Sequence, residues 1–151
     1  MADIVTPGKR RAMMSKIGSR NTKPELTVRR GLHALGFRYV VNDSRLPGSP
    51  DLVLPKWQAA VFVNGCFWHG HDCHLFKVPA TRTEFWQRKI EGNRERDRLT
   101  AIRLYERVWR VGVVWECAIK GKHRPDLPVL LNSLSVWIKS DRRTIELRGM
   151  N

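Results

Sequence analysis

The sequence predicts an α/β fold in which a mixed β-sheet is flanked by helices. The main observation is the order of the patterns, in which a helix precedes three short apolar runs and a second helix, a strand and a third helix follow. The second is length, because 151 residues with 42% hydrophobic content suit a single domain with a proper core. We find no internal repeat or low-complexity segment that would change this expectation.

The first helix is predicted from a capping box at residues 22–25, Thr-Lys-Pro-Glu, with proline in the first turn. Glycine at position 36 marks its end. A strand is expected over 37–41, followed by a turn-rich loop over 42–50. The apolar positions expected to face the core are Leu26, Val28, Leu32 and Leu35.

Two further strands are predicted at 52–54 and 59–63, joined by a hairpin. A second capping box at 81–84 predicts a long helix to about residue 107. Its candidate core positions are Phe85, Ile90, Leu99, Ile102 and Tyr105. The run 110–115 reads as a buried strand, and a last helix is expected over about 125–139.

The division of the chain follows from these patterns. Residues 1–21 carry five basic residues against one acid and are expected to form a DNA-binding arm, although a disordered tail would have the same composition. Residues 22–140 form one domain, and residues 141–151 a C-terminal tail.

Charge points to a polyanionic partner. The chain has 28 Lys and Arg against 14 Asp and Glu, for a net charge of +14. Phosphate neutralisation supplies most non-specific affinity for DNA. A membrane surface is a weaker candidate, because no stretch sets a basic face against a continuous apolar one. No signal peptide or transmembrane-length run is expected, and the three cysteines do not suggest a disulfide framework, so a reducing cytoplasm is the expected compartment.

A metal centre is predicted by the nine residues 66–74, which hold two cysteines and three histidines. Cys66, His71 and Cys73 can share one tetrahedral ion with Cys117, at the end of a distant strand. A Cys₃His site fills all four positions and would hold structural zinc. Reduced, buried cysteines beside solvent-facing histidines are the alternative. His69 and His74 remain unused in this scheme.

A catalytic centre is suggested by Ser49-Pro50-Asp51, followed by strand, turn and strand. This is the skeleton of the PD-(D/E)xK nucleases, in which the Asp and a second acid bind Mg²⁺. The second strand here offers neither acid nor lysine, so Glu25 from the first helix is a candidate replacement. A backbone carbonyl near Val63 could complete the metal shell. A simple turn at Pro50-Asp51 is the alternative.

Aromatic residues surround the expected metal loop. Phe67 and Trp68 cannot both face inward if the neighbouring Cys66 and His71 point at zinc. Apolar side chains can wedge between base steps, and mismatched steps unstack most easily. Phe67, Trp68 and Trp86 are therefore candidate DNA contacts. Core packing is expected for Trp57, Trp109, Trp115 and Trp137.

These features together resemble one family. Four segments of the chain are similar to the very-short-patch repair (Vsr) endonucleases. They are residues 65–69 (Gly-Cys-Phe-Trp-His), 75–86, 95–98 (Glu-Arg-Asp-Arg) and 115–117 (Trp-Glu-Cys). The resemblance covers about residues 14–120. It implies a PD-(D/E)xK-type core with structural zinc, recognition of a T·G mismatch produced by deamination of 5-methylcytosine, and a nick 5′ of the mispaired thymine.

The resemblance also implies roles for individual residues. Asp51 would bind Mg²⁺ together with the Val63 carbonyl, Glu25 would act through a water, and His69 would be the general base or phosphate partner. The zinc ligands would be Cys66, His71, Cys73 and Cys117. Phe67, Trp68 and Trp86 would wedge beside the mismatch, Met14 and Ile17 would close from the other groove, and Lys89 and Asn93 would reach base edges.

Two positions depart from the family pattern. Asn64 stands where His is usual, and Val63 where Thr is usual. Asn cannot titrate near neutrality but can still hydrogen-bond a metal-bound water. We therefore expect a monomeric, Mg²⁺-dependent mismatch endonuclease with structural zinc, acting on double-stranded DNA in the bacterial cytoplasm and nucleoid, with other mismatch-repair proteins as candidate partners. A non-catalytic, zinc-stabilised module for distorted duplex is the alternative.

Overall fold

The computed structural model describes residues 22–150. Its central feature is a five-stranded sheet in the order β1-β2-β3-β4-β5. The strands are β1 (Val40–Val41), β2 (Leu52–Leu54), β3 (Ala59–Asn64), β4 (Arg110–Trp115) and β5 (Thr144–Leu147), and the helices are α2 (Lys23–Ala34), α3 (Thr83–Glu106) and α4 (Leu127–Lys139), with short 3₁₀ turns η1 (Pro55–Trp57) and η2 (Glu116–Ala118).

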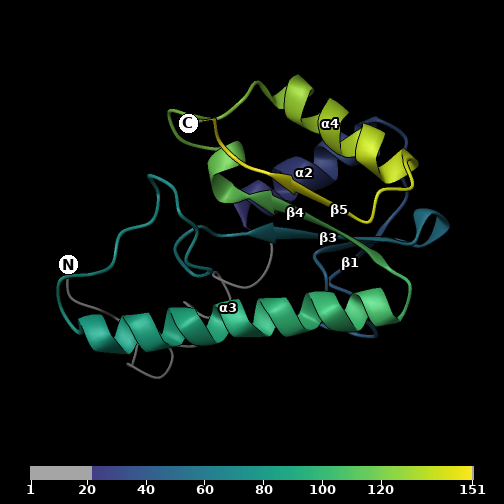
Figure 1. Cartoon of the computed structure of the whole chain (residues 1–151). Coiled ribbons are helices and arrows are strands. Elements are labelled where there is room, and N and C mark those ends of the chain that lie inside the picture. The colour runs from purple at the N-terminus through teal and green to yellow at the C-terminus, as the bar shows by residue number, and fades with distance from the viewer. Residues whose placement is uncertain (1–21, 151) are drawn as a thin grey trace, which may run out of the picture.

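The sheet is mixed, as the sequence predicts. β1, β2 and β3 pair antiparallel, whereas β4 pairs parallel with both β3 and β5. The long helix α3 covers one face, and α2 and α4 lie together on the other (Figure 1). This three-layer arrangement buries the sheet on both sides, which explains why its central strands are apolar except at their ends, Asn64 of β3 and Arg110 of β4.

Alternate residues of β3 pack into two separate hydrophobic clusters, one on each face of the sheet. Val61 and Val63 belong to the large cluster beneath α2 and α4, which also contains the fully buried Trp137. Ala60 belongs to the smaller cluster beneath α3, with Leu104. Because successive side chains in a strand point to opposite faces, a single apolar run serves both layers.

The start of α2 confirms the first capping box. The Thr22 hydroxyl accepts from the Glu25 amide at 3.3 Å, and the Glu25 carboxylate accepts from the Thr22 amide at 3.1 Å. Val28 and Leu32 are fully buried, but Leu35 is 52% exposed, so its predicted core position is wrong. Leu35 is the C-terminal cap residue of α2, where the helix ends.

Three local predictions need correction. The strand expected over 37–41 forms only at Val40–Val41. The second capping box is wrong, because α3 begins after Arg82 without a side-chain cap, and the Thr83 hydroxyl donates to the Pro79 carbonyl instead. Phe85 and Ile102 are 44% and 39% exposed, whereas Leu104, which the sequence pattern missed, is fully buried. The buried residues of α3 are Ile90 and Leu104, so the helix presents only a small apolar face to the sheet.

The C-terminal segment holds a strand that the sequence analysis did not predict. β5 lies in the segment expected to be a tail and pairs with β4, Gly112 opposite Ile145. The guanidinium of Arg110 donates to the carbonyls of Trp57, Trp137, Ile138 and Arg142, tying the last turn of α4 to the sheet. Among residues 22–150, no helix has the length and apolar character needed to cross a membrane.

Candidate active site and metal centre

Most of the predicted site residues gather at one end of the sheet. β3 and β4 run parallel, so their carboxyl ends, Asn64 and Trp115, lie side by side. The loop after β3 carries the cysteines and histidines, and η2 directly follows β4. Topology therefore brings together two segments about fifty residues apart in sequence, which is the junction that the sequence analysis expected zinc to hold.

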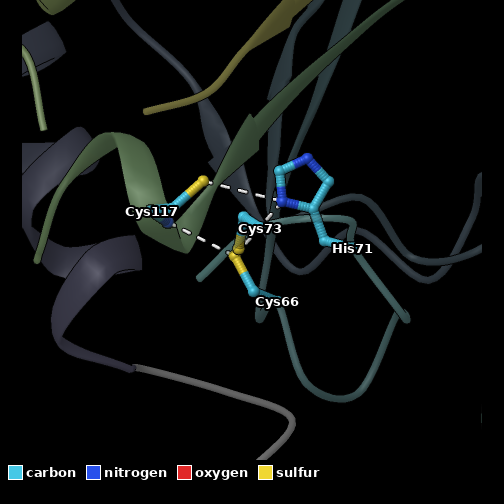
Figure 2. A group of neighbouring side chains, drawn as sticks. All are labelled: Cys66, His71, Cys73 and Cys117. Atoms are coloured by element: carbon cyan, nitrogen blue, oxygen red, sulfur yellow. Dashed lines mark hydrogen bonds between the residues drawn. The ribbon is translucent and has the colours of Figure 1, made fainter. Parts of the chain in front are cut away.

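The four predicted zinc ligands form one cluster (Figure 2). The ligand atoms of Cys66, His71, Cys73 and Cys117 all lie within 4.8 Å of one another. The Nδ1 atom of His71 lies 3.5 Å from the Cys66 sulfur and 3.6 Å from the Cys117 sulfur. Cys66, His71 and Cys117 are buried.

The cluster fits a tetrahedral zinc ion. With Zn–S near 2.3 Å and Zn–N near 2.0–2.1 Å, ideal tetrahedral geometry places sulfur and nitrogen ligands roughly 3.6 Å apart. The two distances from the His71 nitrogen to the Cys66 and Cys117 sulfurs match this ligand–ligand separation. Burial raises the pKa of the Cys66 and Cys117 thiols, so these sulfurs keep their protons unless a metal ion displaces them and stabilises the thiolates.

Surrounding groups fix the orientation of these ligands. The His71 ring stacks on Trp115 with ring centroids 4.0 Å apart. Backbone amides donate to the sulfurs, Cys117 to Cys66 at 3.4 Å and Gly149 to Cys117 at 3.3 Å. The Glu116 carboxylate accepts from the Cys66 amide at 3.1 Å. Such outer contacts are typical of a closed structural metal site.

Asp51 lies at the mouth of the β2–β3 hairpin. Its carboxylate accepts from the Val63 amide at 2.7 Å. Burial, and then a hydrogen bond with Glu25, raise the pKa of Asp51 to about 9. Glu25 is only 2% exposed and lies 3.6 Å from the Arg29 guanidinium. Two carboxyl groups that share a buried site are arranged to hold either a proton or a cation.

His69 forms a dyad with an acid from α3. Its Nδ1 lies 2.5 Å from the Asp97 carboxylate, and the His69 side chain is 26% exposed. The contact engages Nδ1 and not Nε2, which is the arrangement by which a carboxylate orients a proton-transferring imidazole. Sequence reasoning did not name Asp97 as a site residue, although the segment 95–98 carried part of the family resemblance. No spacing pattern predicts that partner, because α3 meets the loop only in the folded chain.

The three candidate wedge residues pack against one another. The ring centroids of Phe67 and Trp68 are 5.2 Å apart, and Trp86 lies 5.4 and 5.8 Å from them. All three are partly exposed. The Asn93 amide donates to the Trp68 carbonyl at 2.8 Å and its oxygen accepts from Arg96, so Asn93 holds the aromatic cluster in place.

The remaining predicted residues are dispersed. Lys89 is exposed on α3. Asn64 is the buried last residue of β3, and Val63 beside it is 9% exposed. Met14 and Ile17 lie outside the described residues.

Comparisons with known proteins agree with this geometry. The family model of the DNA mismatch endonuclease Vsr matches residues 2–75. The DNA mismatch endonuclease Vsr of Escherichia coli (strain K12) is 45% identical over 91% of this chain and 88% of that protein. The type II nicking enzyme V.XorIIP of Xanthomonas oryzae pv. oryzae is 44% identical over 79% and 88%. The type II nicking enzyme V.NmeAIP of Neisseria meningitidis serogroup A is 48% identical over 81% and 87%. The chain therefore belongs to the Vsr family of DNA mismatch endonucleases.

Proposed function

We propose that the protein nicks one strand of double-stranded DNA 5′ of the thymine in a T·G mismatch that arises by deamination of 5-methylcytosine, in a Mg²⁺-dependent reaction. The observation that carries this proposal is the paired Asp51 and Glu25 carboxyl groups at the hairpin mouth. The names of the relatives, a mismatch endonuclease and two nicking enzymes, support the same reaction class. We further propose that it acts as a monomer on nucleoid DNA in the cytoplasm, and other mismatch-repair proteins are candidate partners.

The proposed Mg²⁺ ligands are Asp51, which directly precedes β2, Val63 of β3 and Glu25 of α2. Asp51 would supply a carboxylate oxygen, and Glu25 would act through a water. In a β-strand, the amide and the carbonyl of one residue point toward the same neighbouring strand. The Val63 amide donates to the Asp51 carboxylate, so the Val63 carbonyl points toward the side of β3 on which Asp51 lies. Bound Mg²⁺ would activate water and neutralise charge on the phosphate oxygens.

His69 is the proposed proton-handling residue. Asp97 holds Nδ1, so Nε2 can accept or donate a proton at the phosphate. His71 is occupied by the metal cluster, and the ring of His74 lies against His123 instead. Among the histidines of this loop, only His69 combines partial exposure with a carboxylate that fixes its ring.

The aromatic cluster is the proposed mismatch reader. Phe67, Trp68 and Trp86 form a preassembled surface between the metal loop and α3. A wedge that is already packed loses little conformational freedom on binding, which favours insertion at a weakly stacked step. Lys89 and the basic arm at 1–21, with Met14 and Ile17, are proposed DNA contacts.

The proposal is tested with end-labelled duplexes that each carry one mismatch, incubated with zinc-loaded protein and with or without added Mg²⁺. Mg²⁺ is omitted rather than chelated, so that the cysteine cluster keeps its ion. We expect nicking of the thymine strand of T·G duplex only with Mg²⁺. Asp51→Asn should bind the same duplex and leave it intact.

Asp43→Asn is the matched control, because this carboxylate lies nearby in sequence and accepts its hydrogen bonds from Arg45. It should nick normally. Nicking by Asp51→Asn at the parent rate would contradict the assignment of this site. Cleavage of matched duplex at the same rate as T·G would contradict the proposed substrate.

A further inference from the structure

We propose that His74 and His123 form a second, exchangeable site for a transition-metal ion with a preference for imidazole, separate from the cysteine cluster. His74 follows the ligand Cys73 in the metal loop, and His123 lies between η2 and α4. Neither residue belongs to the group of four cluster ligands. The inference does not depend on the proposed nuclease activity.

The spacing of the two rings suits one shared ion. Their centroids are 4.8 Å apart with an interplanar angle of 86°. Two imidazoles that bind one ion at about 2.0–2.1 Å place their centroids roughly 4.5–5.2 Å apart, for N–metal–N angles from 90° to tetrahedral. The observed separation falls inside this range, so little movement is needed for both rings to bind.

The backbone keeps room beside the ligand nitrogen of His74. Gly121 adopts φ +101°, and a Cβ atom there would lie 2.8 Å from Nε2 of His74. Nε2 of His74 therefore points at the short segment that carries His123. Glycine at this position leaves open the space that any side chain would fill.

A cavity of about 190 Å³ is lined by both rings. Cys73 and Cys117 also line it, so it lies directly against the cysteine cluster. The His123 carbonyl accepts from the Met150 amide at 2.7 Å, which anchors this segment to the chain end. A cavity of this size leaves room for water to complete the coordination of a metal held by two protein ligands.

The chemistry favours Cu²⁺, Ni²⁺ or Zn²⁺, which all bind imidazole well. With two protein ligands the ion should exchange readily, unlike the ion in the closed Cys₃His cluster. Its effect would be to join the loop around His74 to the segment around His123. Those segments adjoin Cys73 and η2, so occupancy would stiffen the rim of the structural metal centre.

The experiment titrates Ni²⁺ into tag-free, zinc-loaded protein and follows binding by calorimetry, with zinc content measured by elemental analysis. We expect one Ni²⁺ per chain while the zinc remains. His74→Ala and His123→Ala should each weaken Ni²⁺ binding by roughly tenfold or more, a loss that even indirect partners cause at metal sites. Each variant is checked for retained zinc and native circular dichroism.

His33→Ala is the matched control, since His33 is an exposed histidine in the last turn of α2, and it should bind Ni²⁺ as the parent does. Ni²⁺ should also raise the unfolding midpoint of the parent but not of either variant. The proposal is overturned if the parent binds no Ni²⁺, if Ni²⁺ only displaces the zinc, or if both variants bind with parental affinity.

Discussion

The cysteine cluster and the carboxylate site lie near the same end of the sheet, but they are built differently. The cluster brings four side chains within 4.8 Å and surrounds them with a stacked Trp115 ring and amide donors. The carboxylate site offers two acids, one backbone amide and the nearby guanidinium of Arg29. The first can satisfy an ion alone, whereas the second supplies too few ligands to do so, and water and substrate would have to complete the coordination. This difference separates a structural metal from a catalytic one.

The largest effect is expected when one ligand of the cysteine cluster is removed. Cys117→Ala should unfold or precipitate the protein, because structural zinc contributes about 10–16 kcal/mol of apparent binding energy, as much as or more than the whole stability of a typical domain. Zinc content and circular dichroism measure the outcome, with one tightly held zinc expected in the parent. His74→Ala, next to the ligand Cys73, should keep that zinc. A zinc-free Cys117→Ala protein that stays folded and active would refute a structural role.

The second prediction concerns the proton-handling dyad. His69→Ala should slow nicking by about 10²–10⁴-fold and retain mismatch binding, since general acid–base catalysis contributes that much. Asp97→Asn should slow it less, because Asp97 acts only by orienting the ring, 2.5 Å from Nδ1. It should also shift the pH–rate profile, which a merely structural contact would not do. Single-turnover nicking at saturating protein is the measurement, and parental rates for His69→Ala would place the base elsewhere.

The third prediction separates recognition from packing. Trp68→Ala should lose discrimination for T·G over matched duplex by about tenfold or more, because base–aromatic stacking is worth roughly 1–3 kcal/mol per base. The control is Trp57→Phe, in η1 at the opposite end of β3 from Asn64, which should leave discrimination unchanged. Competition binding with the two duplexes measures the ratio. Equal losses on both would make Trp68 a packing residue.

Sequence alone predicted most of the fold and the entire cysteine cluster. The cluster was predictable because zinc prefers few ligand types and three of the four residues lie within eight positions, 66–73. β5 was missed because it is a short strand at the sheet edge, in which the half-buried Ile145 and Leu147 alternate with the exposed Thr144 and Glu146. Asp97 was missed because helix periodicity says nothing about a partner on another element. The core face of α3 was misjudged because helical spacing alone does not say which end of a long helix is covered, and Phe85 in the first turn stays 44% exposed.

The smallest expected effect belongs to Asn64, which stands where the family usually carries histidine. Asn64 is buried at the end of β3, close in sequence to Val63 and therefore near the proposed metal. Asn64→His should leave nicking equal to the parent or raise it, because an imidazole can hydrogen-bond water as the amide does and can also titrate. Asn64→Ala should lower the rate modestly, since a buried hydrogen-bonding group is removed.

The two variants sharpen the contrast between the sites, because neither should alter zinc content. Nicking rates across pH distinguish the roles: the histidine variant should gain an additional titration if the new ring handles protons. If Asn64→His abolishes nicking while the fold and zinc persist, the ring does not fit beside Val63 and the backbone there has adapted to the smaller amide. If Asn64→Ala nicks like the parent, Asn64 is a packing residue, and His69 with Asp97 carries the proton transfer alone.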